Sequence, residues 1–389
     1  MKFKFNRPSL KVTHFGPIKS ANVQFGDLTI LVGPQATGKS IFLQLLKILV
    51  DLPHIKFEFR RAGVDWEGKF SSFLEVYFGE GMRKMWEPSR TTIQFTLPVD
   101  LPSLVDTERP KNGEAMFFIP AQRVLALRDG WPQAFGYYDP GVPFTVREFS
   151  EQLRVLTSDF GTSGTLFPVP RRLKDDFREL IQQHIFPGFN LKMDTHRAQK
   201  RLVLSKEGKN DGLPFVVWSA GQREFVPLLL GLYWLMPPAK TSRRQGLEWA
   251  VIEEPEMGLH PRAISVVMLL VFELVARGYR VCLSTHSPQI LDAVWALKYL
   301  REAKADPEAL LKVFDAPKSQ PMVELARRIM EKSTKVYYFH RKGTRDISNL
   351  DPGAEDAGES GWGGLSEFSG RANAEVARAV ANAGRKAKA

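Results

Sequence analysis

The segment from Leu28 to Ser40 constrains the fold of this chain more than any other part of the sequence. Residues 28–32 (LTILV) are apolar or β-branched, which indicates a strand buried on both faces, and the run stops at Gly33. From Ser40 to residue 50, apolar residues recur at helical spacing. The loop between them reads Gly33-Pro34-Gln35-Ala36-Thr37-Gly38-Lys39-Ser40 and matches G-x-x-x-x-G-K-[ST]. Strand, glycine-bounded loop and helix in succession predict an α/β fold.

The residue types of this loop suit a bound phosphate group. Glycines allow consecutive backbone N–H groups to curl around phosphate oxygens. Lys39 would neutralise β- and γ-phosphate oxygens, and the Ser40 hydroxyl would ligate Mg²⁺. A glycine turn with an incidental lysine is the alternative, and the flanking strand and amphipathic helix argue against it. The loop therefore predicts a site for a nucleoside triphosphate with Mg²⁺.

A second strand, 249–252, ends in the carboxylates Glu253 and Glu254. In a protein with a phosphate loop, we expect the strand beside that loop to end in an acid that holds Mg²⁺, directly or through water. The following glutamate can polarise the attacking water. Acids at strand ends are also common solvated caps, so the pair gains its meaning from its position after the phosphate loop.

Two further segments place polar groups at the ends of predicted elements. Ser219-Ala220-Gly221-Gln222 opens a helix, where a hydroxyl, free N–H groups and the positive end of the helix dipole suit a γ-phosphate. Read alone, Ser219 is an N-cap. His286 directly follows a predicted strand and can hydrogen-bond a γ-phosphate, although a lone histidine there is usually structural.

The remaining pattern predicts a mixed α/β chain without internal repeats. The expected strands are 3–5, 11–15, 21–25, 91–97, 115–119 and 279–285, with short strands over 191–218 around a turn at 207–212. The expected helices are 71–85, 146–156, 171–185, 223–235 and 263–276. The order of 249–252, 263–276 and 279–285 implies parallel pairing. Residues 51–190 are mixed and indicate an insertion. Residues 353–370 are rich in Gly, Ser and acids and indicate a linker, followed by a short helix with a basic tail over 372–389.

These motifs in this order resemble the ABC-type ATPase heads shared by the SMC, RecF and OLD families. The resemblance covers roughly residues 20 to 300. It implies a P-loop NTPase of ABC-ATPase type, with a mixed sheet, a parallel core and ATP and Mg²⁺ as ligands. The head would span 1–300 with a lid-like helical/β insertion at 51–190, followed by a small C-terminal α/β extension at 301–350 and a last region at 351–389.

The resemblance also assigns roles by position. Gly33 to Ser40 would be the Walker A loop, Glu253 and Glu254 the Walker B pair, Ser219 to Gln222 the signature turn and His286 the switch histidine. Residues 254–261 (EPEMGLHP) resemble the E-P-E-x-x-L-H-P segment of the OLD-like and RecF-like branch. Ile119-Pro120-Ala121-Gln122-Arg123 stands where that branch has a Q-loop, and Gln122 would link Mg²⁺ to the lid.

Two departures from the family pattern stand out. Glu253 replaces the usual Asp, and its extra methylene shifts the carboxylate by about a bond length, which could lower metal affinity or the hydrolysis rate. The signature reads SAGQ instead of SGGQ, which costs little because Ser219 and Gly221 remain. In such heads the signature turn of one subunit completes the ATP site of its partner, so the resemblance implies a homodimer or higher oligomer built around ATP.

Several functional roles remain open. Only about 90 residues follow the head and carry no E…D-x-D arrangement, so we expect an ATPase of slow turnover that lacks nuclease activity. The resemblance favours an ATPase of a bacterial two-gene anti-phage defence system, similar to AriA of PARIS or PtuA of Septu, that controls a separately encoded effector such as a nuclease. The alternatives are a RecF-like DNA-repair clamp and a scaffold with negligible turnover. A phage protein is a further candidate partner.

Charge and composition bear on partners and compartment. The formal net charge of +11 favours polyanionic partners, and the basic clusters that could serve a DNA clamp are Arg60-Arg61, Arg171-Arg172 with Lys174, Arg197 with Lys200 and Arg201, and Arg341-Lys342 with Arg345. For each cluster a solvated face is the better explanation than a DNA site, because arginines this dispersed are common. The single cysteine, Cys282, permits no internal disulfide. The longest uncharged stretch, 225–239, is too short to span a membrane. We therefore expect a cytoplasmic protein without a membrane partner.

Overall fold

The computed structural model describes residues 8–158, 160, 164–170, 172–206, 212–238 and 242–386. The strands are β1 (Ser9–Phe15), β2 (Ile18–Gln24), β3 (Leu28–Val32), β4 (Thr92–Phe95), β5 (Leu97–Val99), β6 (Met116–Ile119), β7 (Leu127–Arg128), β8 (Trp131–Pro132), β9 (Thr165–Phe167), β10 (Phe189–His196), β11 (Gln199–Lys206), β12 (Gly212–Pro214), β13 (Trp249–Glu253), β14 (Arg280–Thr285), β15 (Thr334–His340) and β16 (Gly343–Asp346). The helices are α1 (Lys39–Arg61), α2 (Phe70–Phe78), α3 (Leu101–Thr107), α4 (Phe144–Ser158), α5 (Asp175–His184), α6 (Ala220–Leu235), α7 (Pro261–Ala276), α8 (Pro288–Glu302), α9 (Pro307–Val313), α10 (Gln320–Met330), α11 (Ala357–Ser360) and α12 (Glu367–Lys386).

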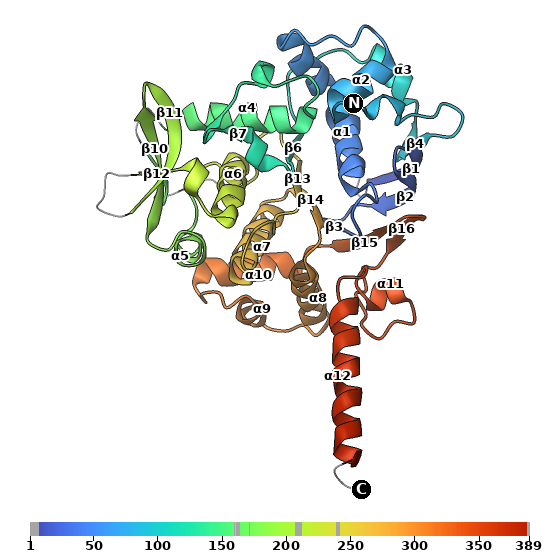
Figure 1. Ribbon diagram of the computed structural model, residues 1–389, viewed down its shortest axis with the longest axis vertical. Helices are drawn as coiled ribbons and strands as arrows, with labels where there is room; N and C mark the ends of the chain where they lie inside the picture. The colour runs from blue at the N-terminus through green and yellow to red at the C-terminus, as the bar shows by residue number, and fades with distance from the viewer. Residues whose placement is uncertain are drawn as a thin grey trace.

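A six-stranded sheet of order β16-β15-β3-β14-β13-β6 forms the centre of the molecule (Figure 1). All neighbouring pairs are parallel except β15 with the edge strand β16. Parallel strands need crossover connections, which place helices over both faces of the sheet. The predicted α/β architecture, a mixed sheet with a parallel core, is confirmed, as is the parallel pairing of β13 with β14.

The two faces of the central sheet are buried in different hydrophobic clusters. Alternate residues of β3 and β13, such as Ile30 and Ile252, pack into a cluster that includes α6 and α7. Leu31 and Val251, which point the other way, join a cluster that includes α1, β1 and β2. Because both faces are covered, these strands are continuously apolar, which is the pattern that made them recognisable in the sequence.

The predicted N-terminal hairpin is present as β1 and β2, which pair antiparallel in a second sheet of order β2-β1-β4-β5. The expected strand at 3–5 lies outside the described residues. The range 51–190, expected as an inserted lid, contributes to several layers: β4 pairs with β1, and β6 pairs with β13. A third sheet, β12-β11-β10-β9, contains the short strands expected after residue 191, and the turn at 207–211 lies outside the described residues.

The C-terminal region is more closely integrated than the sequence indicated. β15 pairs parallel with β3 in the centre of the sheet. The prediction of a linker over 353–370 is wrong in its middle part, because residues 357–360 form α11 and Trp362 is buried, with its indole N–H donating to the Leu350 carbonyl. A Cβ at Gly363 would lie 2.5 Å from a Val32 methyl group, so this segment packs against the end of β3.

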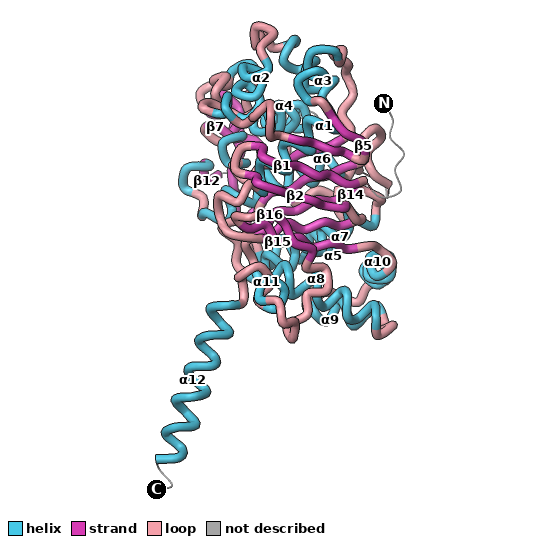
Figure 2. Tube along the Cα trace, turned by 90° about the vertical axis from the view of Figure 1, so that its right-hand side faces the viewer, coloured by secondary structure: helices cyan, strands magenta, loops and turns pink. Residues whose placement is uncertain are grey.

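The final helix, α12, begins earlier and runs longer than the expected helix at 372–389. It extends away from the body of the protein in both views (Figures 1 and 2). Residues 367–380 of this helix are exposed. Among the residues that the structure describes, no helix combines the length and apolar character that crossing a bilayer requires.

Candidate functional site

The predicted site residues follow the carboxyl ends of parallel strands, which meet at one edge of the central sheet. β3 leads into the phosphate loop, β14 into His286 and β13 into Glu254. The expectation that the strand ending in Glu253 lies beside the phosphate-loop strand is wrong, because β14 lies between β3 and β13. This order places His286 on the strand between the loop and the two glutamates. Ligands of open α/β sheets bind at this edge.

Two glycines of the loop are required by close packing. Gly33 has φ 144°, and a Cβ there would lie 2.0 Å from the Phe339 carbonyl oxygen of β15. Gly38 has a left-handed φ of 93°, caps α1, and would place a Cβ 2.6 Å from Ile18. Side chains at either position would displace the backbone that carries them. The loop therefore has one tightly determined path from β3 into α1, and the N-terminal N–H groups of α1 open toward it.

Lys39 curls back over the loop that precedes it. Its ammonium group donates hydrogen bonds to the carbonyls of Gly33 at 2.6 Å and Pro34 at 2.8 Å. Burial lowers the pKa of Lys39 from 10.5 to about 8, and the nearby carboxylates Glu254, Glu253 and Glu256 oppose that change. A cation held in this way is positioned to contact phosphate oxygens within the loop.

Ser40 and Glu253 offer the oxygens that a magnesium ion would use. Glu253 is buried, and its Oε2 accepts a hydrogen bond from the Ala121 amide at 3.2 Å. Its Oε1 has no hydrogen-bond partner among the described residues. Burial raises the pKa of Glu253, and the neighbouring Ser40 hydroxyl and the Ala121 amide oppose that rise. One hydroxyl and one carboxylate suit Mg²⁺, which takes few protein ligands and completes its shell with phosphates and water.

No larger metal cluster accompanies this pair. Across residues 8–386, leaving out the short undescribed gaps, no group of three or more His, Cys, Asp or Glu side chains could hold a metal ion. One hydroxyl and one carboxylate leave most of a coordination shell to other donors, so this pair fits an ion that is shared with a bound nucleotide, and Ser40 and Glu253 are the residues that would hold it.

Glu254 and His286 face each other at the mouth of the site. Glu254 Oε1 lies 3.6 Å from His286 Nε2, and both side chains are about one-quarter to one-third exposed (30% and 26%). Glu254 has a left-handed φ of 44°, and its N–H donates to the Ser284 carbonyl, which ties the turn to the end of β14. Burial and the nearby Lys39 lower the pKa of His286, with Glu254 opposing them. His286 is therefore largely neutral at pH 7.

Glu256 links the segment that follows β13 to the segment that follows β14. Its Oε1 accepts hydrogen bonds from the Thr285 hydroxyl at 2.8 Å and from the His286 amide at 2.7 Å. Burial raises the pKa of Glu256 despite these hydrogen bonds. The contacts fix the backbone of His286 relative to the 254–261 turn, so the two segments that follow β13 and β14 form one unit.

The predicted signature turn lies at the start of α6. Ser219 is the N-cap, and it forms a capping box with Gln222: the Ser219 Oγ accepts from the Gln222 amide, and the Gln222 side chain accepts from the Ser219 amide. Ser219 is therefore an N-cap, as its sequence position alone indicated. A Cβ at Gly221 would lie 2.8 Å from the Gly258 carbonyl oxygen, so the turn packs directly on the 254–261 segment of its own chain.

Gln122 and the residues on either side of it occupy the end of β6. The Gln122 side chain is exposed, whereas the Ala121 amide before it reaches the Glu253 carboxylate. Arg123, the next residue, was not recognised from the sequence as part of the site. It is completely buried and donates to the carbonyls of Glu224, Glu253 and Glu254. Its position beside the expected Q-loop was the only available signal, and an arginine in a loop ordinarily indicates a surface position.

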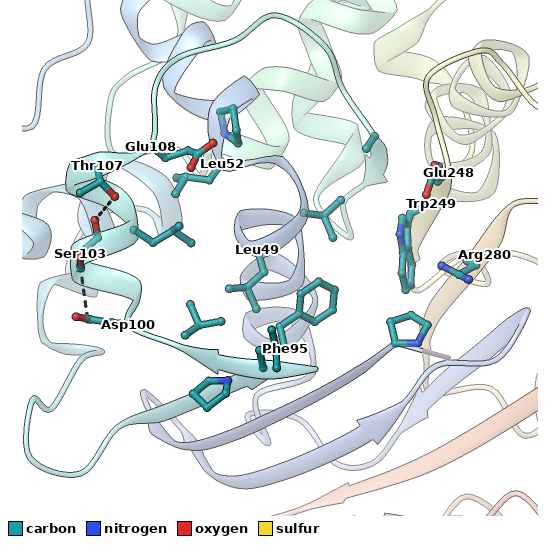
Figure 3. A pocket seen from close by; sticks show the side chains of 18 of the residues that line it. Leu49, Leu52, Phe95, Asp100, Ser103, Thr107, Glu108, Glu248, Trp249 and Arg280 are labelled. Atoms are coloured by element: carbon teal, nitrogen blue, oxygen red, sulfur yellow. Dashed lines mark hydrogen bonds between the residues drawn. The ribbon is translucent and has the colours of Figure 1, made fainter. Parts of the chain in front are cut away.

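A cavity of about 650 Å³ lies elsewhere, near the amino ends of the strands (Figure 3). Leu49 of α1, Phe95 of β4 and Trp249 at the start of β13 line it, and Arg280 lies over the Trp249 ring at 5.4 Å. It contains none of the predicted site residues. Its walls are mostly apolar, so its chemistry does not suit a triphosphate.

Comparison with known families gives one match. Residues 145–292, less than half of the chain, match a family described as "AAA domain, putative AbiEii toxin, Type IV TA system". This range includes Ser219, Glu253, Glu254 and His286 and begins beyond the phosphate loop. No curated protein matches the chain.

Several solved structures show a distant likeness. An SMC head bound to the C-winged helix domain of ScpA is 11% identical, with a TM-score of 0.43, and the alignment covers 87% of this chain and 95% of that one. A dimeric bacterial ABC transporter cassette is 10% identical, with a TM-score of 0.36 and coverage of 87% and 97%. The SMC head domain from Thermotoga maritima is 11% identical, with a TM-score of 0.31 and coverage of 88% and 98%. At these values the likenesses carry no conclusion about function.

Proposed function

We propose that this protein binds and hydrolyses ATP with Mg²⁺ as an ABC-type ATPase and that two copies close around the nucleotide. The observation that carries the proposal is the meeting of Lys39, Glu253, Glu254 and His286 at one edge of the sheet, around a loop whose glycines leave no room for side chains. Burial lowers the pKa of Lys39, and the charges that oppose this come from Glu254 and Glu256 after β13 and from Glu253 at its end, so these groups share one electrostatic environment.

Each residue has a role that its surroundings permit. Lys39 and the first N–H groups of α1 bind the phosphates. Ser40 and Glu253 would hold Mg²⁺, which would neutralise phosphate charge there. Glu254 is partly exposed and faces His286, so its carboxylate can orient and deprotonate the attacking water. The neutral His286 lies beside it and can hydrogen-bond the γ-phosphate. The longer side chain of Glu253, in place of an aspartate, and the hydrogen bond that its carboxylate accepts from the Ala121 amide support slow turnover.

Ser219 is proposed to act on the nucleotide of a second copy. It is exposed, and among the described residues no hydrogen bond or ion pair connects residues 219–222 with the loop at 33–40. Its N-cap geometry presents the start of α6 to solvent as an anion-binding end. A partner that approaches with its phosphate loop would meet these groups, which supports a composite site.

A complementation experiment tests the composite site. Lys39→Ala removes the phosphate lysine, and Ser219→Arg blocks the signature turn, so each variant alone should lose hydrolysis. In a mixed dimer one site carries both changes and the other carries neither. Random mixing yields half heterodimers with one intact site each, so the mixture should recover up to about one-quarter of the parental rate.

The matched control mixes Lys39→Ala with Glu254→Gln. Lys39 and Glu254 serve the same nucleotide from one chain, so both sites of the heterodimer stay defective and no rate returns. Recovery in neither mixture would contradict the composite site. Recovery in the control would contradict the assignment of Glu254. Loss of ATP binding in Lys39→Ala alone tests the phosphate loop itself.

The biological role that we propose is control of a separately encoded effector, such as a nuclease, in bacterial anti-phage defence. The description of the matched family, with its toxin of a type IV toxin–antitoxin system, supports this role. The test expresses the protein with its neighbouring gene and measures phage plaque formation and co-purification. Unchanged plaque counts together with absence of a bound neighbour would refute the role without touching the ATPase proposal.

A RecF-like DNA clamp finds less support. Three of the basic clusters lie on elements at different sides of the molecule: one includes Arg61 at the end of α1, one Arg201 in the β10–β11 hairpin and one Arg345 in β16 (Figure 1). These three arginines are ion-paired with acids, Arg61 with Glu58 and Glu151, Arg201 with Asp194 and Arg345 with Asp356. DNA-stimulated hydrolysis with salt-sensitive DNA affinity would reverse this preference.

A further inference from the structure

Arg123 joins two parts of the protein that the proposed function assigns to different nucleotide sites. It follows β6 and is fully buried. Its Nε donates to the Glu224 carbonyl at 3.0 Å, one terminal nitrogen to the Glu253 carbonyl at 3.0 Å and the other to the Glu254 carbonyl at 3.1 Å. The last nitrogen also lies 3.3 Å from the Glu224 carboxylate. One planar guanidinium thus holds α6 against the end of β13.

The start of α6 cannot move independently of the turn after β13. Glu224 lies within the first two turns of α6, which Ser219 caps. Gly221 packs so closely on the Gly258 carbonyl that a methyl group there would lie 2.8 Å from it. The Arg123 fork and this glycine contact secure the helix start on two sides. Ser219, Glu254 and the 254–258 turn therefore belong to one rigid block.

Burial of the Arg123 charge costs free energy of folding unless the charge finds partners. Desolvation lowers the pKa of Arg123, and the carboxylates of Glu224, Glu256, Glu254 and Glu253 oppose that change. An apolar side chain would fill the space without a buried charge. An apolar side chain could not hold three carbonyls from two elements in a fixed geometry. The planar guanidinium can, because its N–H donors point in fixed directions.

We propose that Arg123 is a positioning residue that couples the two nucleotide sites of the dimer. This inference rests on the proposed function, in which Glu254 acts on the nucleotide of its own chain and Ser219 closes over the nucleotide of the partner. A shift of Glu254 when ATP arrives in one site is transmitted through Arg123 and α6 to the Ser219 that serves the other site. Hydrolysis is then positively cooperative in ATP, and Arg123 carries the cooperativity.

The test compares Arg123→Lys with Arg147→Lys. Lysine keeps the charge and fits the space, but its ammonium cannot reach the three carbonyls in the same geometry. Arg147 is likewise a buried arginine, but it lies in α4 and donates to the Val76 carbonyl, so it reports the general cost of altering a buried arginine. The readouts are the Hill coefficient for ATP hydrolysis, the affinity for a non-hydrolysable analogue and the melting temperature.

The parent and Arg147→Lys should show a Hill coefficient measurably above 1, because a dimer with one occupied site is slower but still active, and Arg123→Lys should show a coefficient of about 1. The analogue should bind Arg123→Lys within about threefold of the parental affinity, because Lys39 and the loop are untouched. A cooperative Arg123→Lys variant, or a parent that hydrolyses ATP without cooperativity, would overturn the coupling and leave the ATPase proposal standing. A parent without ATP hydrolysis would refute the proposed function and this inference with it.

Discussion

The lowered pKa of Lys39 predicts that ATP affinity falls as the pH rises through 8. In the free protein, burial lowers the pKa of this ammonium to about 8. Bound phosphates stabilise the charged form and raise the pKa again. ATP binding must therefore be accompanied by proton uptake wherever the free lysine is neutral, and each proton taken up makes the affinity depend on pH.

The size of the effect follows from that pKa. With a value near 8, about 90% of Lys39 is protonated at pH 7 and about 10% at pH 9. If binding requires the charged lysine, the dissociation constant rises roughly tenfold between pH 7 and 9, or about 1.4 kcal/mol of binding free energy. Proton uptake per bound ATP should rise from about 0.1 at pH 7 to about 0.9 at pH 9.

Isothermal titration calorimetry measures both quantities. A non-hydrolysable analogue is titrated with Mg²⁺ at pH 7, 8 and 9 in buffers of different ionisation enthalpy. His286→Asn should keep the slope, because burial and Lys39 already hold the pKa of His286 below its usual range. Lys39→Arg should lose the slope whatever its affinity, because arginine stays charged. A parental affinity that is constant within twofold and shows no proton uptake would refute the reasoning.

Three further predictions concern the glutamates and the signature turn. Glu254→Gln should still bind ATP but hydrolyse it at least about a hundredfold more slowly and accumulate as an ATP-dependent dimer in size-exclusion chromatography; unchanged turnover would remove Glu254 as the base. Gly221→Ala should lower the hydrolysis rate at least about tenfold, because its methyl group would displace α6 from the Gly258 carbonyl, and a parental rate would contradict that packing. Burial raises the pKa of Glu253, so protonation favours the folded state. Glu253→Gln should therefore unfold at a higher temperature than the nucleotide-free parent at pH 7, with a difference that shrinks toward pH 5, and a lower melting temperature would contradict this sign.

Local signals in the sequence were sufficient for the elements that carry the site. Residues 28–40 combine a doubly buried strand, two glycines and a helix, and 249–254 combine an apolar run with two acids, so each could be recognised without knowledge of its neighbours. Helix α7 and strand β14 followed from the same periodicities. What these signals share is that the pattern and its physical cause lie within a dozen residues of each other.

Strand order could not be predicted in the same way. β14 separates β3 from β13, and β15 joins the other side of β3 from about 300 residues further along the chain. Pairing between distant parallel strands depends on which crossovers pack together, and no local pattern specifies it. The prediction of a linker over 353–370 was wrong for a related reason. The Gly, Ser and acidic residues of this segment are typical of loops, and only the tertiary structure places Gly363 against Val32 and lets the Trp362 indole donate to the Leu350 carbonyl.

Arg123 shows why a buried polar residue is the hardest part of a site to find. Its burial is compensated by three carbonyls and a carboxylate from two elements a hundred residues and more away. Because the contacts are mainly to the backbone, the residue types at positions 224, 253 and 254 do not indicate that an arginine binds there. A side chain that binds main-chain oxygens leaves no complementary signal at the positions it contacts.

The phosphate loop presents the opposite difficulty, because two separate physical causes each account for a glycine at position 33. Gly33 was predicted to be glycine so that backbone N–H groups could approach phosphate, yet the Phe339 carbonyl of β15 already excludes a side chain there in the folded protein. Gly33→Ala would therefore disturb the central sheet whether or not the loop binds a nucleotide. Lys39 is free of this ambiguity: within the described part of the chain, the hydrogen bonds of its ammonium group go to carbonyls of the loop itself. A loss of ATP binding in Lys39→Ala, with the melting temperature retained, can be attributed to the missing cation.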